Sequence, residues 1–213
     1  MKCVRNMYYQ MVGAPPATST MTAEMAGIVH IGSTRHQFIQ EAVSSMRSHG
    51  VDCDYIDVET FIEQRGLTDL RVVSKEGYET KLFHEKLRIS FMCDGIIRYK
   101  GHYYILEIKT ETSYKWSARQ NYDEDSHSDQ AITYSICFGI DDIMFLYESR
   151  DTTAKKGFVV TVTPEMKFSV LSKIEEADQA VAALVPPPIP EKLPRSACTY
   201  CAYVELCTKQ GPK

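Results

Sequence analysis

The chain has 213 residues, of which 44% are hydrophobic, and it carries a net charge of −4 at pH 7. This composition can build one compact domain with an ordinary core. The negative net charge argues against a protein that binds nucleic acid over its whole surface, although it allows a local basic groove. No apolar run approaches the roughly 20 residues that cross a bilayer, and the opening MKCVRNMYYQ lacks the apolar core of a secretory signal, so we expect a cytoplasmic protein with no membrane partner.

The first regular element is a helix in the segment GSTRHQFIQEAVSSMRSHG. Residues 10–31, which precede most of it, mix Gly, Pro, Thr, Ser and Met without periodicity, and they predict a loop or an irregular helical segment. Ser33 or Thr34 can cap the helix, and Gly50 can end it. Its apolar positions recur at helical spacing: Phe38, Ile39, Val43 and Met46. This assignment puts His36 in the first helical turn.

Two β-rich runs flank Lys100 and Gly101, which predicts a β-hairpin. A loop centred on this pair places residues whose numbers add to 201 opposite each other, so Asp94 faces Glu107. Directly opposed residues have Cβ atoms about 4.5–5.5 Å apart, close enough for two carboxylates to hold one cation. Lys109 follows Glu107 by two positions and therefore shares its face of the strand.

The triplet of Asp94, Glu107 and Lys109 suits metal-assisted hydrolysis of a phosphodiester. The two carboxylates would hold Mg²⁺ or Mn²⁺, hard cations that favour oxygen ligands. The lysine would position or deprotonate the attacking water and stabilise negative charge on the phosphate oxygens. The alternative is an exposed edge strand on which Glu107 and Lys109 form a solvated ion pair.

The segment DQAITYSICFGI predicts a helix after an acidic, serine-rich start. On this helix His127, Gln130 and Tyr134 line one face, because they are spaced at i, i+3 and i+7. Its apolar positions are Ile132, Ile136 and Phe138.

Further elements complete the predicted order. DDIMFLYES and GFVVTVT are typical of strands. Thr163 and Pro164 favour the start of a long helix, which the PPPIP segment at 186–190 ends.

These residues resemble the signature of the PD-(D/E)xK nuclease superfamily, with Asp94 as its acidic residue and Glu107, Ile108 and Lys109 as its E-x-K tripeptide. Cys93 stands where the superfamily nominally has proline. The resemblance implies an α/β fold with a restriction-endonuclease-like core, in which helices flank a central mixed β-sheet. It also implies that the backbone carbonyl of Ile108 joins the two carboxylates around Mn²⁺ or Mg²⁺.

More narrowly, the chain resembles the RecB-type branch of that superfamily. Gly32 to His36 match its G-x-x-x-H motif, whose histidine is a further metal ligand. Gln130 to Tyr134 match its Q-x-x-x-Y motif, which contributes to the catalytic site and is commonly preceded by a histidine, here His127.

The seven cysteines are unevenly placed, and three of them form a C-x2-C-x5-C tail. Three thiolates leave a tetrahedral site one ligand short. The opening KCVRNMYY resembles the C-x-R-x-x-Y-Y segment of iron–sulfur nucleases of this branch, in which one amino-terminal cysteine joins three carboxy-terminal ones around a [4Fe–4S] cluster. Zinc is the alternative, because four thiolates suit either metal. The implied ligands are Cys3, Cys198, Cys201 and Cys207.

The other three cysteines match no motif and are predicted to be small buried residues. They are Cys53, Cys93 and Cys137. In length and motif order the chain is most similar to the CRISPR-associated Cas-four nuclease family, with AddB-type nuclease domains as larger relatives. This resemblance implies a single RecB-like nuclease domain over residues 1–213, in which residues 1–31 and 186–213 bind the cluster and residues 32–185 form the nuclease core.

An aromatic and basic segment follows the hairpin and is a candidate DNA contact. Trp116, with Tyr114 beside it, could stack on bases of single-stranded DNA, and Lys115 and Arg119 could bind phosphates. His127 is a further candidate. The alternative role for Trp116 is plain packing.

The expected function is that of a metal-dependent DNA nuclease. We expect an exonuclease on single strands or duplex ends that leaves 5′-phosphates and 3′-hydroxyls; endonuclease activity is compatible with the same site. The family context implies CRISPR adaptation, recombination and repair, or viral DNA processing, with DNA and a CRISPR integrase or recombination proteins as partners. The alternative is a DNA-end-binding assembly subunit in which the cluster is structural and cleavage is incidental.

Overall fold

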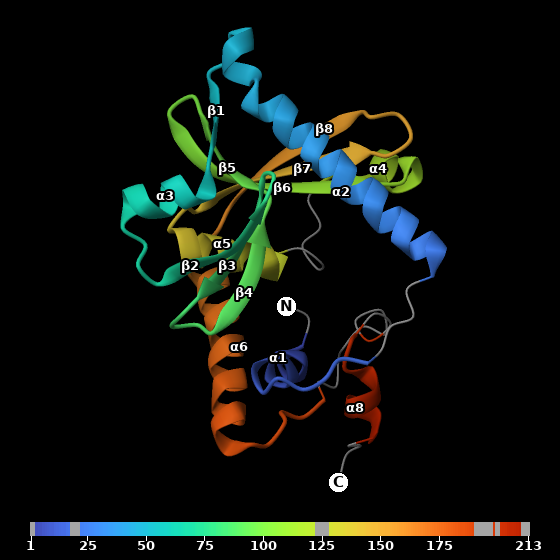
Figure 1. The fold of residues 1–213 in the computed structure, drawn as a ribbon, viewed down its shortest axis with the longest axis vertical. Coiled ribbons are helices and arrows are strands. Elements are labelled where there is room, and N and C mark those ends of the chain that lie inside the picture. The colour runs from blue at the N-terminus through green and yellow to red at the C-terminus, as the bar shows by residue number, and fades with distance from the viewer. Residues whose placement is uncertain (1–2, 18–21, 122–127, 190–197, 199–200, 210–213) are drawn as a thin grey trace. The chain divides into compact units, whose positions relative to one another are not determined.

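A computed structural model describes residues 3–17, 22–121, 128–189, 198 and 201–209 (Figure 1). The chain folds into two compact units. The sheet unit comprises residues 23–167, and the cysteine unit comprises residues 1–22 and 168–213. The sequence placed the corresponding boundaries at residues 31/32 and 185/186.

A mixed five-stranded sheet forms the centre of the sheet unit, with strand order β1-β5-β6-β7-β8. Only β6 and β7 pair in parallel; the other neighbours are antiparallel. A parallel pair needs a crossover connection, and here the crossover carries helices α4 and α5. The strands are β1 (Cys53–Ile56), β5 (Gly95–Tyr99), β6 (His102–Glu111), β7 (Asp142–Ser149) and β8 (Lys155–Thr161).

The hairpin of β5 and β6 has the predicted register. Tyr99 pairs with His102 and Gly95 pairs with Leu106, so paired numbers add to 201 along the ladder. Asp94 therefore lies one position beyond the ladder, on the level of Glu107. The first of the two predicted β-rich runs forms two strands, however. They are separated at Asp94, and the strand before Asp94 belongs to another sheet.

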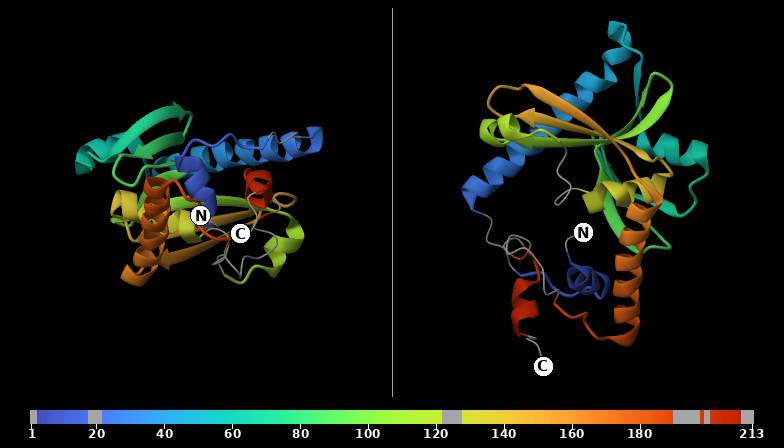
Figure 2. Two further views of the ribbon diagram at one scale, coloured as in Figure 1. Left: turned by 90° about the horizontal axis from the view of Figure 1, so that it is seen from below. Right: turned by 180° about the vertical axis from the view of Figure 1, so that it is seen from behind.

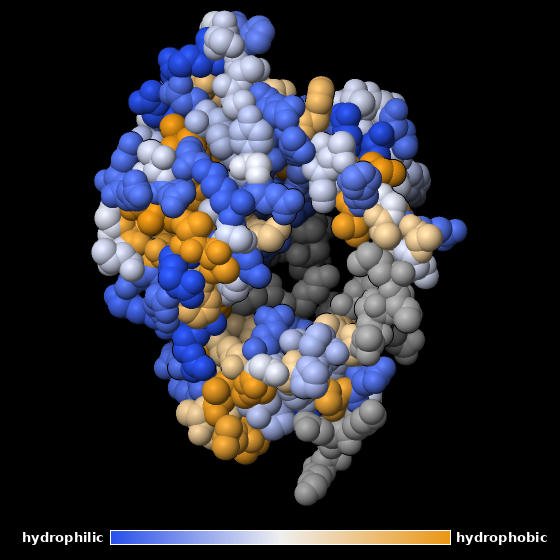
Figure 3. Space-filling view, in the orientation of Figure 1, coloured by the Kyte–Doolittle hydropathy of each residue, from blue (hydrophilic) through white to orange (hydrophobic). Residues whose placement is uncertain are grey.

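That second sheet has three antiparallel strands in the order β2-β3-β4. Sequence reasoning identified only part of β4 and missed β2 and β3, along with β1 and α3 (Val58–Arg65). Figure 3 shows apolar surface over α3 and the neighbouring three-stranded sheet, where Val73 and Met92 are 45% and 48% exposed. The strands are β2 (Leu70–Glu76), β3 (Glu79–His84) and β4 (Ile89–Cys93).

Helix α2 spans Ala23–Ser44 and continues into the short 3-10 helix η1 (Met46–His49), after which Gly50 has a left-handed conformation. The predicted N-cap at Ser33 or Thr34 was wrong, as was the first-turn position of His36. The Thr34 hydroxyl donates to the His30 carbonyl at 2.9 Å, within the helix. The first turns lack periodicity because they are exposed: Ile28, Val29 and Ile31 are all more than half exposed.

Two helices cover opposite faces of the five-stranded sheet (Figures 1 and 2). Ile39 and Val43 of α2 pack in one core with Leu106 and Ile108 of β6. The predicted core residues Phe38 and Met46 are instead 54% and 37% exposed. Helix α5 lies on the other face, which carries the alternate residues of β6. The helices of this crossover are α4 (Ser113–Ala118) and α5 (Ser128–Phe138).

The cysteine unit contains α1 (Val4–Met11) and α8 (Val204–Lys209). Helix α6 (Pro164–Ala183) starts at the predicted proline, and the boundary between the units falls within it. Tyr8, Tyr9 and Tyr203 are buried in one cluster, with the Tyr9 and Tyr203 rings 5.5 Å apart. This cluster joins the two ends of the chain. Among the residues described, no helix has the length and apolarity needed to cross a membrane.

Candidate metal sites

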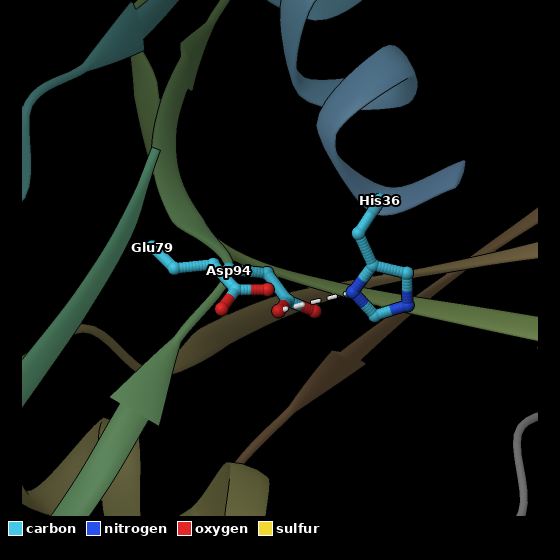
Figure 4. A group of neighbouring side chains, drawn as sticks. All are labelled: His36, Glu79 and Asp94. Carbon is cyan, nitrogen blue, oxygen red and sulfur yellow. Dashed lines mark ion pairs between the residues drawn. The ribbon is translucent and has the colours of Figure 1, made fainter. Parts of the chain in front are cut away.

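His36, Glu79 and Asp94 form a group whose ligand atoms all lie within 4.8 Å of one another (Figure 4). They come from α2, the start of β3 and the break between β4 and β5. His36 Nδ1 lies 3.5 Å from Asp94 Oδ1. Imidazole nitrogen and carboxylate oxygen are ligands for Mn²⁺, and the oxygens also suit Mg²⁺. The group therefore has donors that fit a divalent cation.

Several hydrogen bonds fix Asp94. Its Oδ2 accepts from the Ile108 backbone N–H at 2.7 Å, which ties the carboxylate to β6 and leaves Oδ1 toward His36. Its carbonyl accepts from Gln40 Nε2 at 2.6 Å and from the Tyr55 hydroxyl at 2.9 Å. The backbone at this break is thus held from α2, β1 and β6 together.

Glu107 and Lys109 lie on one face of β6 and form an ion pair, as the strand period predicts. Glu107 is only 1% exposed. Burial, and then repulsion by Asp94, raise the pKa of Glu107 to about 7, although Lys109 works to lower it. The edge-strand alternative is wrong, because β6 lies between β5 and β7 and the carboxylate is buried.

Neighbouring carboxylates raise the pKa of both basic groups of the site, Lys109 and His36. Burial acts to lower the pKa of Lys109, but the Glu107 carboxylate outweighs it and the net pKa is raised. Burial likewise acts to lower the pKa of His36, but its hydrogen bond with Asp94 and its attraction to that carboxylate together outweigh burial, and the net pKa is raised. A cation bound by these carboxylates would compete with both interactions.

The Q-x-x-x-Y residues brace the same region from α5. Gln130 Nε2 donates to the Tyr134 hydroxyl, which in turn donates to the Met92 carbonyl, two residues before Asp94. Tyr134 is buried, and burial followed by the nearby Glu107 raises its pKa well above the usual value. The position of Tyr134 indicates support of the Asp94 backbone. His127 lies outside the described residues.

The candidate DNA-contact residues have protein partners within the sheet unit. Trp116 Nε1 donates to the Tyr147 carbonyl at 3.3 Å, and Lys156 Nζ lies 4.3 Å from the centre of the Trp116 ring. Arg119 pairs with Glu111 and lies 3.9 Å from the centre of the Tyr147 ring. Lys115 is exposed. Trp116 and Arg119 thus fasten α4 to the sheet, which favours the packing alternative for Trp116.

The cysteine unit brings its four cysteines into one neighbourhood. The pKa of the Cys207 thiol is raised, first by burial and then by the thiols of Cys3, Cys198 and Cys201, while Arg5 works to lower it. Asn6 Nδ2 donates to Cys201 Sγ at 3.3 Å. A guanidinium and an N–H donor beside the sulfurs suit thiolate ligands of a metal cluster. Cys53, Cys93 and Cys137 are buried elsewhere, as predicted.

Glu79 is the site residue that sequence reasoning missed. It follows the Gly77-Tyr78 loop, across which it pairs with Glu76. The glycine signals a turn in the sequence, but nothing in the local pattern shows which carboxylate of that hairpin faces Asp94.

Comparisons with known proteins assign no family. No family model and no curated protein matches the chain. A solved structure described as "Crystal structure of SSO0001" is similar to 98% of this chain and 82% of its own chain, with 16% sequence identity and a TM-score of 0.48.

Proposed function

We propose that this protein is a metal-dependent DNA nuclease of the RecB-type branch of the PD-(D/E)xK superfamily, with a restriction-endonuclease-like core. The observation that carries the proposal is the meeting of Asp94 with His36 on one side and with the Glu107-Ile108-Lys109 strand on the other. His36 is distant in sequence from the other residues and belongs to a separate motif. An ordinary surface ion pair would not require their convergence.

In this mechanism His36, Asp94, Glu107 and the Ile108 carbonyl would hold Mn²⁺ or Mg²⁺. The bound cation supplies a water of lowered pKa and screens the phosphate charge. Lys109, positioned by Glu107, orients that water and places its ammonium against the phosphate oxygens as negative charge grows on them. With a cation bound there, Glu107 would be ionised, because attraction to the cation would offset both its burial and the repulsion from Asp94. Water attack with departure of the 3′ oxygen leaves 5′-phosphate and 3′-hydroxyl ends.

Gln130 and Tyr134 act as positioning residues in this proposal. Their hydrogen bonds to each other and to the Met92 carbonyl hold the chain just before Asp94. Catalytic carboxylates need such support, since small displacements of reacting groups cost large factors in rate.

We propose further that Cys3, Cys198, Cys201 and Cys207 bind a [4Fe–4S] cluster. The cysteines act on the Cys207 thiol electrostatically, so they lie in one neighbourhood. The choice of an iron–sulfur cluster over a single zinc ion rests on the resemblance of the C-x-R-x-x-Y-Y start and the C-x2-C-x5-C tail to those of iron–sulfur nucleases.

The cellular setting follows from the same resemblance. We propose that the protein acts in the cytoplasm on single-stranded DNA or DNA ends, as Cas-four-like nucleases of CRISPR adaptation do, or in recombination, repair or viral DNA processing. Its protein partners would then be an integrase or recombination proteins.

The decisive experiment measures cleavage of end-labelled single-stranded and duplex DNA with and without Mn²⁺. The wild-type protein should cleave only with the cation, whereas Lys109→Ala should be inactive. Lys81→Ala is a matched control, because Lys81 is an exposed strand lysine outside the site. Binding of DNA ends without Mn²⁺-dependent cleavage would replace the nuclease with an end-binding subunit.

A further inference from the structure

The tip of the β2–β3 hairpin is fixed against the end of α2 and against β1. The Tyr78 hydroxyl lies 3.1 Å from Ser44 Oγ at the end of α2. The Tyr78 and Tyr55 rings meet edge-on at 5.2 Å, and the Tyr55 hydroxyl lies 3.4 Å from the Tyr78 carbonyl. The same Tyr55 hydroxyl bonds the Asp94 carbonyl at 2.9 Å. Tyr55 therefore links the hairpin tip directly to the backbone that carries Asp94.

A glycine after Asp94 makes this link feasible. A Cβ at Gly95 would lie 2.5 Å from the Tyr55 ring, a distance that real Cβ atoms do not show. The absent side chain lets the Tyr55 ring lie over this stretch of backbone. The contact belongs to the architecture around Asp94 and gives the neighbouring hairpin a defined position.

The docked hairpin presents Glu79 beside Asp94 and His36, within the 4.8 Å group. In the described part of the chain, no lysine or arginine forms an ion pair with Glu79. Two carboxylates at this distance repel each other, and a divalent cation bound between them would remove that repulsion. The sequence motifs account for His36 and Asp94 and leave Glu79 without a role.

We propose that Glu79 is a further carboxylate ligand of the divalent cation, and that its ligation fastens the β2–β3 hairpin to the five-stranded sheet. The proposal rests on the cation site of the proposed function and extends it. A hard cation accepts six or more oxygen ligands, and Glu79 supplies one from a sheet that otherwise contributes nothing to the site. Cation binding would then order the three-stranded sheet as well as prepare the catalytic centre.

The test compares Glu79→Gln with Glu76→Gln. Both substitutions remove one negative charge from the same hairpin, and Glu76 is the exposed cross-strand neighbour of Glu79. Mn²⁺ affinity is measured by isothermal titration calorimetry. We expect Glu79→Gln to weaken binding about tenfold or more, the range typical for loss of a group that supports a metal, and Glu76→Gln to bind as the wild type does.

Hydrogen exchange supplies a second readout that is independent of activity. Mn²⁺ should slow amide exchange in residues 74–84 of the wild type and of Glu76→Gln, but not of Glu79→Gln. Unchanged Mn²⁺ affinity in Glu79→Gln would overturn the proposal. So would absence of Mn²⁺-induced protection of the hairpin in the wild type, and this measurement holds even if the variant fails to fold.

These outcomes are separable from failure of the nuclease proposal. If the wild type binds no Mn²⁺ in this unit, both proposals fail. If binding depends on Glu107 but not on Glu79, the nuclease site stands and only the role of Glu79 is wrong.

Discussion

The Glu107 carboxyl makes the stability of the metal-free protein depend on pH. Its pKa moves from an ordinary 4.5 to about 7 in the folded chain. At 1.36 kcal/mol for each pKa unit, this change costs about 3 kcal/mol once the group is ionised. The side chain is 1% exposed, so solvent screens little of this cost.

The sign follows from proton binding. Between pH 4.5 and about 7 the folded state holds the Glu107 proton and the unfolded state has lost it, so the free energy of unfolding falls as pH rises. The contribution of the Glu107 proton to the free energy of unfolding is complete below pH 4.5 and lost above about pH 7. Glu107→Gln cannot titrate there. Without Mn²⁺, the wild type should therefore lose about 3 kcal/mol more than the variant between pH 4.5 and pH 8.

Urea denaturation followed by tryptophan fluorescence measures this difference. Trp116 is the single tryptophan and lies in the sheet unit, so its signal reports on the unit that contains Glu107. Mn²⁺ at pH 8 should restore stability to the wild type and not to Glu107→Gln, because only the wild type retains the ligand. Parallel pH profiles for the two proteins would refute the claim that Glu107 is buried at a cost that the cation relieves.

Substitutions at Lys109, at His36 and at the cysteines have distinct expected results. Lys109→Ala should abolish cleavage while calorimetry shows Mn²⁺ binding retained, since the lysine acts on water and phosphate; loss of Mn²⁺ binding would make it a structural residue. His36→Ala should weaken Mn²⁺ binding more than DNA binding, and equal losses in titration and gel-shift assays would contradict its role as a ligand. Anaerobically purified protein should be brown, with absorbance near 400 nm. Alanine at a cluster ligand should bleach this band and destabilise the fold. A colourless, stable protein with stoichiometric zinc would overturn the iron assignment. The substitutions expected to bleach are at Cys3, Cys198, Cys201 and Cys207, and those expected to keep the colour are at Cys53, Cys93 and Cys137.

The strand that carries Glu107 and Lys109 was predictable because local rules determine it. A two-residue hairpin loop fixes the register of both strands, and the register puts Asp94 on the level of Glu107. The strand period then puts Lys109 beside Glu107. Both results depend on residues fewer than 20 positions apart.

The start of α2 was not predictable from periodicity, since its first turns bury no face and show no apolar repeat. Good helix formers, Ala23, Glu24 and Ala26, occur only in the first turn of that segment, and the residues that follow add no apolar face to mark the helix. Glu79 was missed for another reason. Its place in the site depends on the docking of Tyr78 against Tyr55 and Ser44, which are distant in sequence.

The most direct test of the account is a crystal structure of the Lys109→Ala variant with Mn²⁺ and single-stranded DNA, with the metal located by anomalous scattering. We expect Mn²⁺ about 2.0–2.3 Å from a His36 ring nitrogen and from carboxylate oxygens of Asp94 and Glu107, with a DNA phosphate oxygen on the same ion. Mn²⁺ more than about 3 Å from these groups, or DNA bound away from them, would contradict the central claim that they form one nuclease site.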